Sequence, residues 1–348
     1  MIKPRLFAHI SAFILICFCL PLLHADISHA AGKKYTLKIA SLAPEGSVWS
    51  KRFHEFTDAV TAKSNGEITF KIYSGGVMGD DRSMYRKMRA GQLQGGGFTM
   101  TGIGEIVPDF RVLGIPFLFD SYTEVDRAWL KLWPLLQQSF ADKGLKLIAT
   151  TEVGFIYTMS TKPITTINEL RQAKCWVPEG DPISKTYLEK LGVVPTPLSI
   201  PDVLTSLQTG MIDTVFNAFY GSIVLQWFTR TKYITDIPFG YSYGALVLDG
   251  RTFARLPKEY QQLIETAATN NFANLVNDTR KSNADALNVL RENGISMVSA
   301  TPEALTALQA CRQRTVDDIL GTAFSKKIYE TLVNELAVSR NASGQPQP

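Results

Sequence analysis

YTLKIASLAPEGSVWSKRFHEFTDAVTAKSNGEITFKIY, residues 35–73, is the stretch that decides the fold class. Residues 35–41 alternate apolar with polar side chains, which is typical of a strand. Ser47 opens a helical pattern, and the turn at Asn65-Gly66 separates it from a second strand at residues 67–73. The apolar face of the helix holds Trp49, Phe53, Phe56 and Val60. Strand, helix and strand at this spacing predict a βαβ unit.

The same alternation continues along the chain. A second unit begins near Gly154, with strands predicted at 155–160, 173–177 and 211–216. Strands are also predicted on either side of it, at 147–152 and 245–248, and the latter feeds one helix from Pro257 to Gly294. This helix would be about 55 Å long, enough to brace two lobes. The pattern predicts an α/β protein with mostly parallel sheets flanked by helices.

The first thirty residues have the features of a signal peptide. Lys3 and Arg5 precede an apolar run at residues 6–23, and Ser28-His29-Ala30 offers small residues for cleavage. We expect cleavage after Ala30, with the bond after Ala25 as the competing site. A retained membrane anchor is the alternative, because the apolar run is nearly long enough to span a bilayer.

Length and charge limit the kinds of partner. A chain of 348 residues exceeds the size at which one hydrophobic core keeps growing, so two lobes are expected. The formal net charge of +4 is scattered, whereas a nucleic-acid surface needs a concentrated basic face. We therefore expect a small-molecule partner, no nucleic acid, and a monomer.

Enzyme signatures are missing from the sequence. His54 is the only histidine beyond the predicted leader, and the chain has no nucleophile elbow and no phosphate-binding loop. Cys175 and Cys311 are the only cysteines beyond it, and we expect two buried thiols rather than a pair. The sequence predicts no catalytic residues, no metal and no cofactor. A periplasmic hydrolase on a two-lobed scaffold is the competing class.

An ordered set of short motifs resembles one known family, the DctP-type solute receptors of tripartite ATP-independent periplasmic (TRAP) transporters. No single motif is specific, but the set follows the family's order over most of the chain. The motifs lie at residues 66–73, 79–84, 91–93, 107–110, 115–119, 162–164, 195–198, 207–213, 217 and 232–233.

The resemblance implies a two-lobed periplasmic binding protein fold with a long bracing helix. Lobe I would comprise residues 31–153 and 243–282, and lobe II residues 154–242 and 283–338, with a disordered tail at 339–348. It also implies a receptor that closes over one solute, by a population shift towards the closed state, and delivers it to a membrane-embedded permease driven by an ion gradient. Such a receptor performs no chemistry. A sensory or scaffold protein built on the same fold is a further alternative.

The chain departs from the family where a solute carboxylate is usually held. Trp176 stands in place of the arginine that grips the carboxylate, and Ile156 in place of a second arginine. Leu42 replaces a polar contact and Phe216 an acidic residue, whereas Asn217 is retained. Each lost charge-assisted hydrogen bond would remove about 1.5 to 3 kcal/mol of binding free energy.

These exchanges predict an apolar or aromatic pocket with one directional polar contact. The candidate ligand-binding residues are Trp176, Asn217, Ile156, Tyr157, Phe216, Tyr220, Leu42 and Thr99. Hydrophobic, amphipathic, aromatic and neutral polar solutes all fit such a pocket.

Three alternatives remain open. Trp176 could be a core residue, with an acidic solute held instead by another base such as Arg82 or Lys185. Phe216, Phe219 and Tyr220 could serve packing alone. Asn217 could satisfy only the backbone at the end of its strand.

Overall fold

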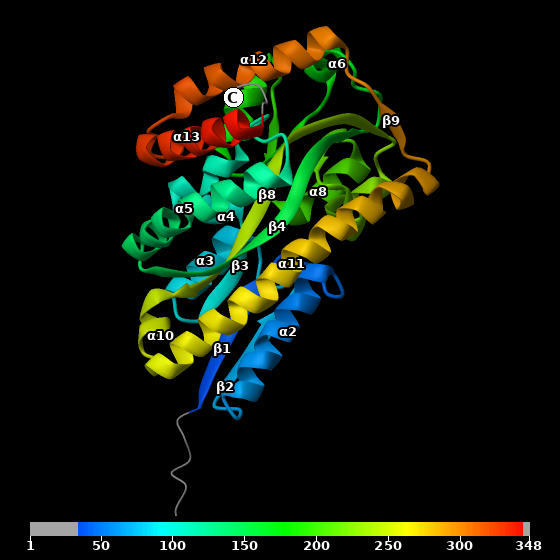
Figure 1. Ribbon diagram of the computed structural model, residues 1–348. Coiled ribbons are helices and arrows are strands. Elements are labelled where there is room, and N and C mark those ends of the chain that lie inside the picture. The colour runs from blue at the N-terminus through cyan, green and yellow to red at the C-terminus, as the bar shows by residue number, and fades with distance from the viewer. Residues whose placement is uncertain (1–33, 344–348) are drawn as a thin grey trace, which may run out of the picture. The chain divides into compact units, whose positions relative to one another are not determined.

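The computed structural model describes residues 34–343, and the predicted signal peptide lies outside them. β1 (Tyr35–Ser41), α2 (Val48–Lys63) and β2 (Ile68–Tyr73) form the first unit (Figure 1). The Ser47 hydroxyl caps α2 by accepting a hydrogen bond from the Ser50 N–H. Because β1 and β2 run parallel, with Tyr35 opposite Ile68, the predicted βαβ unit is confirmed.

Two long strands pass through the centre of the main sheet. β4 (Leu145–Ser160) and β8 (Tyr233–Asp249) pair antiparallel along most of their length. The sequence predicted separate strands at 147–152 and 155–160, and this is wrong, because β4 runs through both. Gly154, at φ +109°, permits a register shift within the strand and does not end it.

The main sheet is mixed. Its strand order is β2-β1-β3-β8-β4-β7, with β3 (Gly95–Thr99), β7 (Thr214–Asn217) and, beside β8, β9 (Ser296–Val298). β3 lies parallel to β1, and a separate parallel pair is formed by β5 (Trp176–Pro178) and β6 (Thr196–Leu198). Within the main sheet, pairing is antiparallel at β3–β8, β8–β4 and β4–β7. The crossing strands thus join parallel units through antiparallel contacts.

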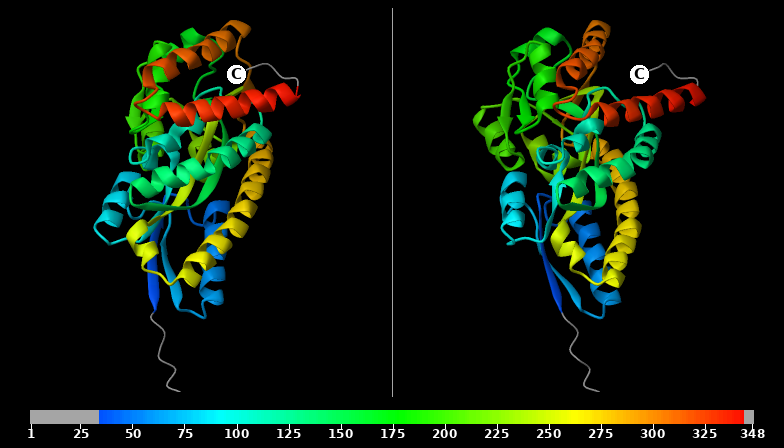
Figure 2. Two further views of the ribbon diagram at one scale, coloured as in Figure 1. Left: turned by 60° about the vertical axis from the view of Figure 1, so that its left-hand side comes forward. Right: turned by 90° about the vertical axis from the view of Figure 1, so that its left-hand side faces the viewer.

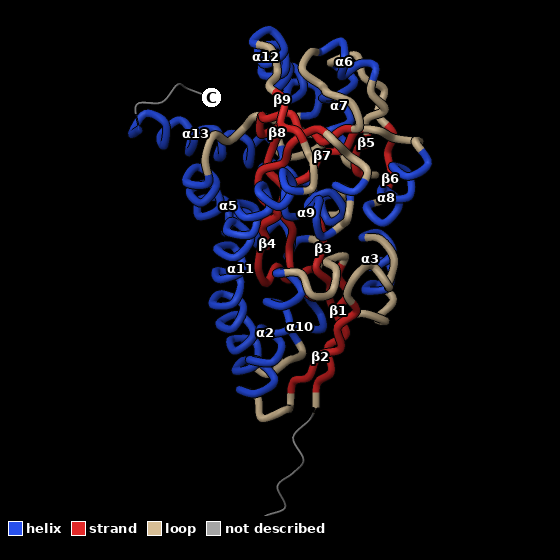
Figure 3. Tube along the Cα trace, turned by 90° about the vertical axis from the view of Figure 1, so that its right-hand side faces the viewer, coloured by secondary structure: helices blue, strands red, loops and turns tan. Residues whose placement is uncertain are grey.

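Helices flank the strands, as Figures 2 and 3 show from several sides. The first group comprises α3 (Asp81–Arg89), α4 (Met100–Gly104), η1 (Pro108–Gly114), α5 (Tyr122–Asp142), α6 (Ile167–Gln172), α7 (Pro182–Lys190), α8 (Ile200–Thr209), α9 (Phe219–Val224) and η2 (Trp227–Thr229). The second group comprises α10 (Gly250–Ala254), α11 (Lys258–Glu292), α12 (Pro302–Ile319) and α13 (Lys326–Ser343). Among residues 34–343, no helix is long and apolar enough to cross a membrane.

α11 is the predicted long helix, with 35 residues. It packs against α2, β4 and α9, and therefore contacts elements on both sides of the predicted lobe division (Figure 1).

The end of the chain differs from the predicted boundaries. α13 packs against α5, which belongs to the predicted first lobe, whereas residues up to 338 were assigned to the second. It also continues to Ser343, so residues 339–343 are helical and not part of a tail. Its apolar residues Leu332 and Leu336 join the core cluster that contains Leu136 and Phe140 of α5, and this burial keeps the helix on that side.

Candidate functional site

Strands β1, β3, β5 and β7 border one cavity of about 210 Å³. Ser41 ends β1, Thr99 ends β3, Trp176 and Pro178 come from β5, and Asn217 ends β7. Ligands of open α/β sheets bind outside the carboxyl ends of such strands. The topology therefore places a binding site where these four ends meet.

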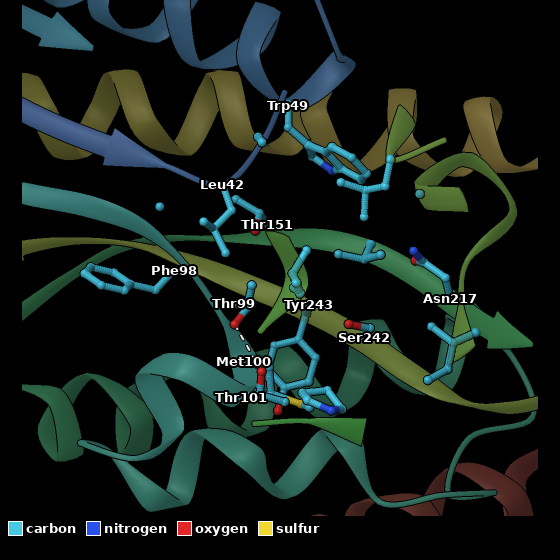
Figure 4. Close-up of a pocket in the computed structure, with 18 of the residues that line it drawn as sticks. Leu42, Trp49, Phe98, Thr99, Met100, Thr101, Thr151, Asn217, Ser242 and Tyr243 are labelled. Carbon is cyan, nitrogen blue, oxygen red and sulfur yellow. Dashed lines mark hydrogen bonds between the residues drawn. The ribbon is translucent and has the colours of Figure 1, made fainter. Parts of the chain in front are cut away.

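The crossing strands form the back of the cavity. β4 contributes Thr151, Val153 and Ile156, and β8 contributes Tyr241 to Tyr243. Figure 4 shows Trp49, Leu42 and Thr151 on one side of these strands and Tyr243, Met100 and Thr101 on the other. Both long strands thus place side chains in a site that the two halves of the chain share.

No lysine, arginine or histidine lines the cavity within the described residues. Its ionisable lining groups are one carboxyl, Asp181, and the phenols Tyr241 and Tyr243. The Tyr241 hydroxyl donates to Glu152 Oε2 at 3.0 Å, and the Tyr243 hydroxyl donates to the Phe110 carbonyl. Both phenols therefore present aromatic surface rather than free hydroxyls.

The Asp181 carboxylate is engaged in capping the first turn of α7. Its carboxylate accepts a hydrogen bond from the Ile183 N–H at 3.0 Å and caps α7. Burial raises the pKa of Asp181 above its usual range, against the opposing effect of the Arg111 charge and the capping hydrogen bonds. Arg111 is 6 % exposed, does not line the cavity, and donates from Nη2 to the Gly180 carbonyl at 2.9 Å.

The two bases considered as substitutes for the missing arginine lie outside the cavity. Arg82 pairs with Glu105 at 2.8 Å and Glu179 at 2.5 Å, beside a smaller cavity of about 30 Å³. Lys185 pairs with Glu189 at 2.7 Å on the exposed face of α7. In this structure neither base reaches the main cavity.

Trp176 both lines the cavity and packs in the core. Its indole N–H donates to the Leu198 carbonyl at 3.0 Å, and its side chain is almost fully buried. Its ring meets the ring of Trp227 edge to face, with centroids 5.1 Å apart. The residue therefore presents an apolar ring, with its one polar group already bonded, where the resemblance expects a guanidinium.

Only one of the two polar atoms of the Asn217 side-chain amide is hydrogen-bonded within the protein. Its Oδ1 accepts from the Ala218 N–H at 2.8 Å, whereas its Nδ2 has no acceptor among residues 34–343. A Cβ at Gly221 would lie 2.4 Å from Oδ1, so glycine at this position leaves room for the amide. Trp227 also lines the cavity, and its indole N–H makes no hydrogen bond with an oxygen of another residue in the described chain. Two uncharged donors are thus available at the site.

Thr99 is held by a buried carboxylate. Its hydroxyl donates to Asp81 Oδ2 at 2.6 Å and accepts from the Gly102 N–H at the start of α4. Burial raises the pKa of Asp81 to about 6, although the hydrogen bonds from Thr99 favour the ionised form. This arrangement fixes the Thr99 side chain at the cavity wall.

The remaining predicted site residues divide into two groups. Leu42, Ile156 and Phe216 line the cavity. Tyr157 and Tyr220 do not line it: Tyr157 stacks on Phe219 with ring centroids 4.2 Å apart, and the Tyr220 hydroxyl accepts from the Val48 N–H at 2.9 Å. Both tyrosines therefore contact neighbouring residues of the protein and not the cavity itself.

Several residues that line the cavity were not among the predicted site residues. Phe239 and the run Tyr241-Ser242-Tyr243 belong to β8, and Thr151 belongs to β4. The alternation at 241–243 was a signal for a strand with one face on the site. Nothing local indicated that this strand crosses behind residues that lie far away in sequence.

The described residues include two cysteines and no cluster of metal-binding side chains. Residues 34–343 contain no group of three or more His, Cys, Asp or Glu side chains placed to hold a metal ion. Cys175 and Cys311 are buried free thiols, as expected from the sequence. The site is suited to enclosing a solute, because it combines apolar walls with a few uncharged polar groups.

Comparisons with known proteins show which family the chain resembles over most of its length. Residues 39–322 match the family model described as bacterial extracellular solute-binding protein, family 7, named DctP. A solute-binding protein of Chromohalobacter salexigens is 28% identical over 171 residues, which cover 49% of this chain and 51% of that relative. The chain therefore spans about half the length of that relative.

Two solved structures share the fold. A TRAP periplasmic solute binding protein from Desulfovibrio salexigens, with bound orotic acid, has a TM-score of 0.80 at 21% identity and covers 87% of this chain and 98% of its own. The sugar acid binding protein DctPAm from Advenella mimigardefordensis, in complex with galactonate, has a TM-score of 0.81 at 20% identity, with the same coverage. With the family match over most of its length, this chain belongs to the DctP family of bacterial extracellular solute-binding proteins, a family of transport receptors rather than enzymes.

Proposed function

We propose that this receptor binds a small uncharged or amphipathic solute and delivers it to an ion-gradient-driven TRAP permease in the membrane. The observation that carries the proposal is the absence of any lysine, arginine or histidine among the residues that line the cavity in the described chain. A carboxylate enclosed there would lose its hydration without gaining a cationic partner.

Uncharged donors supply the polar recognition. Asn217 Nδ2 and the indole N–H of Trp227 make no hydrogen bond with another residue between 34 and 343, and both residues line the cavity. A hydrogen bond from either donor to an acceptor on the solute would contribute about 0.5 to 1.5 kcal/mol to binding. A carbonyl, an ether or a hydroxyl oxygen meets this requirement.

Aromatic walls supply the apolar recognition. Phe216 stacks on Phe239 with centroids 4.7 Å apart, and Tyr241 stacks on Tyr243 at 5.6 Å. Together with Trp176 these rings line the cavity and would cover the faces of a flat or aliphatic solute. Leu42, Ile156 and Thr99 complete the contacts that we propose for the solute.

A second candidate is a receptor for an organic acid. It is favoured by the two structural neighbours, which were solved with orotic acid and with galactonate. In this chain such an acid would depend on the uncharged donors, since Arg82 and Lys185 are paired elsewhere.

A matched pair of probes separates the candidates. Hexanamide and hexanoate have the same chain and differ only in the head group, which is a neutral amide in one and an ionised carboxylate with no N–H donor in the other. Isothermal titration at pH 7.5 should show the amide binding at least about tenfold tighter, because an unpaired carboxylate loses several kcal/mol on burial. Tighter binding of hexanoate would establish the organic-acid candidate instead.

Location and delivery complete the proposal. We propose export by a leader at residues 1–30 and action as a monomer in the periplasm. Closure would bring two lobes around the solute, with α13 on the side of the lobe that contains α5. Deletion of a permease pair encoded beside this gene should abolish uptake of the solute that co-purifies with the receptor, and uptake that persists would favour a sensory role.

A further inference from the structure

We infer that the cavity has an apolar arm that receives a hydrocarbon chain of the solute. The arm is formed by Phe53 of α2, Phe272 and Leu275 of α11, and Leu246 of β8, all of which line the same cavity as Asn217. This inference rests on the proposed function and adds the class of solute: a polar head with an unbranched or slender apolar tail.

The arm lies within the layer between the main sheet and two helices. Its four residues belong to the core cluster that α2 and α11 form against the sheet. Each is less than a tenth exposed, so the arm is an interior space and not part of the outer surface. In Figure 4, Trp49 and Thr151 mark the side on which α2 and α11 run along the strands.

The polar groups of Trp49 and Ser50, which lie beside the arm, are already bonded. The Ser50 hydroxyl donates to the Ser47 carbonyl at 3.1 Å, and the Trp49 indole N–H donates to the Glu152 carbonyl at 2.8 Å. An interior space without free polar groups holds water poorly and favours apolar atoms. A tail would fill the arm without leaving any protein group unsatisfied.

The opposite end of the cavity has the reverse character. Asn217 Nδ2 lacks an acceptor, and the Ser242 hydroxyl makes no hydrogen bond with any other residue between 34 and 343. A solute that satisfies both ends must be amphipathic, with its oxygen acceptor at the strand ends and its tail under the helices.

Ring packing holds the arm open. Phe56 lies behind the arm, with its ring centroid 6.1 Å from that of Phe53 and 5.7 Å from that of Phe272. Phe56 is buried in the same cluster but does not line the cavity. It is therefore a matched control for substitutions of Phe53.

The experiment measures affinity against tail length. Linear primary amides from propanamide to octanamide are titrated calorimetrically into the wild-type chain and three variants. For the wild type we expect affinity to rise about fourfold per methylene until the arm is full, and then to level off. Leu275→Phe fills the arm and should level off at a shorter chain, whereas Phe53→Leu enlarges it and should level off at a longer one.

A control variant shows whether a changed length profile comes from a larger arm or from general loss of packing in the core. Phe56→Leu makes the same chemical change as Phe53→Leu in the same cluster and should keep the wild-type profile. If Leu275→Phe fails to fold, this phenylalanine pair still carries the test. A wild-type profile that does not depend on length, or equal shifts in both phenylalanine variants, would overturn the arm.

The outcomes also separate the arm from the proposed function. If short amides bind well and longer ones gain nothing, the uncharged-solute proposal stands and the arm is wrong. If fatty acids from propanoate to octanoate bind tighter than the amides yet show the same length dependence, the arm stands and the uncharged head is wrong. Binding of neither series would overturn both.

Discussion

At the residue scale, Trp176 determines which part of its side chain the cavity receives. Its N–H is bonded to the Leu198 carbonyl, so the cavity receives only the ring. The two interpretations offered by the sequence, core residue and pocket residue, describe the same side chain. A position that could hold an arginine thus helps to exclude charge.

Replacing Trp176 by arginine should reverse the preference of the site. Trp176→Arg places a guanidinium where no other base lines the cavity, so hexanoate should gain about tenfold in affinity or more and hexanamide should lose affinity. Titration calorimetry with both probes measures this. Trp176→Phe keeps an aromatic ring and should keep the preference for the amide; unchanged amide affinity in Trp176→Arg would remove Trp176 from the site.

Asp81 predicts a dependence of stability on pH. Its pKa of about 6 exceeds the ordinary aspartate value, so the folded chain binds the proton more tightly than the unfolded chain. The contribution of Asp81 is therefore most favourable below pH 4 and is lost as the pH rises through about 6.

Urea unfolding at pH 4.5 and pH 7 tests this contribution. Asp81→Asn cannot titrate, so the free energy of unfolding of the wild type should fall by about 2 kcal/mol more between these two pH values than that of the variant. Equal changes in both proteins would mean that burial does not shift the pKa of Asp81.

At the scale of elements, α11 is fixed to the sheet by one arginine. Arg280 contacts Glu152 of β4 at 2.9 Å and Asp126 of α5 at 2.6 Å, and its guanidinium lies 4.3 Å from the centre of the Tyr122 ring. Glu152 is 2 % exposed, and burial raises its pKa despite the arginine. The Arg280 side chain thus links α11 to β4 and α5 and neutralises the buried Glu152 carboxylate.

Removing this arginine should be costly. Arg280→Met leaves the Glu152 carboxylate buried without its cation, and we expect a loss of about 3 to 5 kcal/mol in the free energy of unfolding at pH 7. Arg52→Met is the matched control, because Arg52 of α2 pairs with Asp278 of α11 at the surface, where such a pair contributes about 0 to 1 kcal/mol. Similar losses in both variants, measured by urea unfolding, would contradict this role.

Locally encoded elements followed from the sequence, and non-local ones did not. The βαβ unit at residues 35–73 and the helix α11 have periodic apolar faces that few other structures satisfy. The continuity of β4 was missed, since Gly154 resembles a terminator and only the pairing with β8 shows that the strand continues. Antiparallel pairing of β4 with β8 joins residues that are 73 to 104 positions apart in the sequence, which no local pattern records.

The site divides in the same way. Residues at strand ends, such as Trp176 and Asn217, were named because motifs around them follow a family order. Tyr243 of β8 was missed because its strand crosses the site from a distant part of the chain, and Phe53 was assigned to the core on its helical spacing. A core face and a cavity wall have the same apolar pattern in sequence, so only the three-dimensional arrangement separates them.

At the scale of the whole molecule, we propose that the two halves of the chain enclose a solute in a cavity that offers it no cationic side chain among the described residues. The most direct measurement is native mass spectrometry of the receptor purified from its own periplasm, followed by extraction and identification of the bound compound. We predict an uncharged or amphipathic molecule with an oxygen acceptor at one end and apolar carbon at the other. A small dicarboxylate or a sugar acid as the only bound compound would contradict the claim.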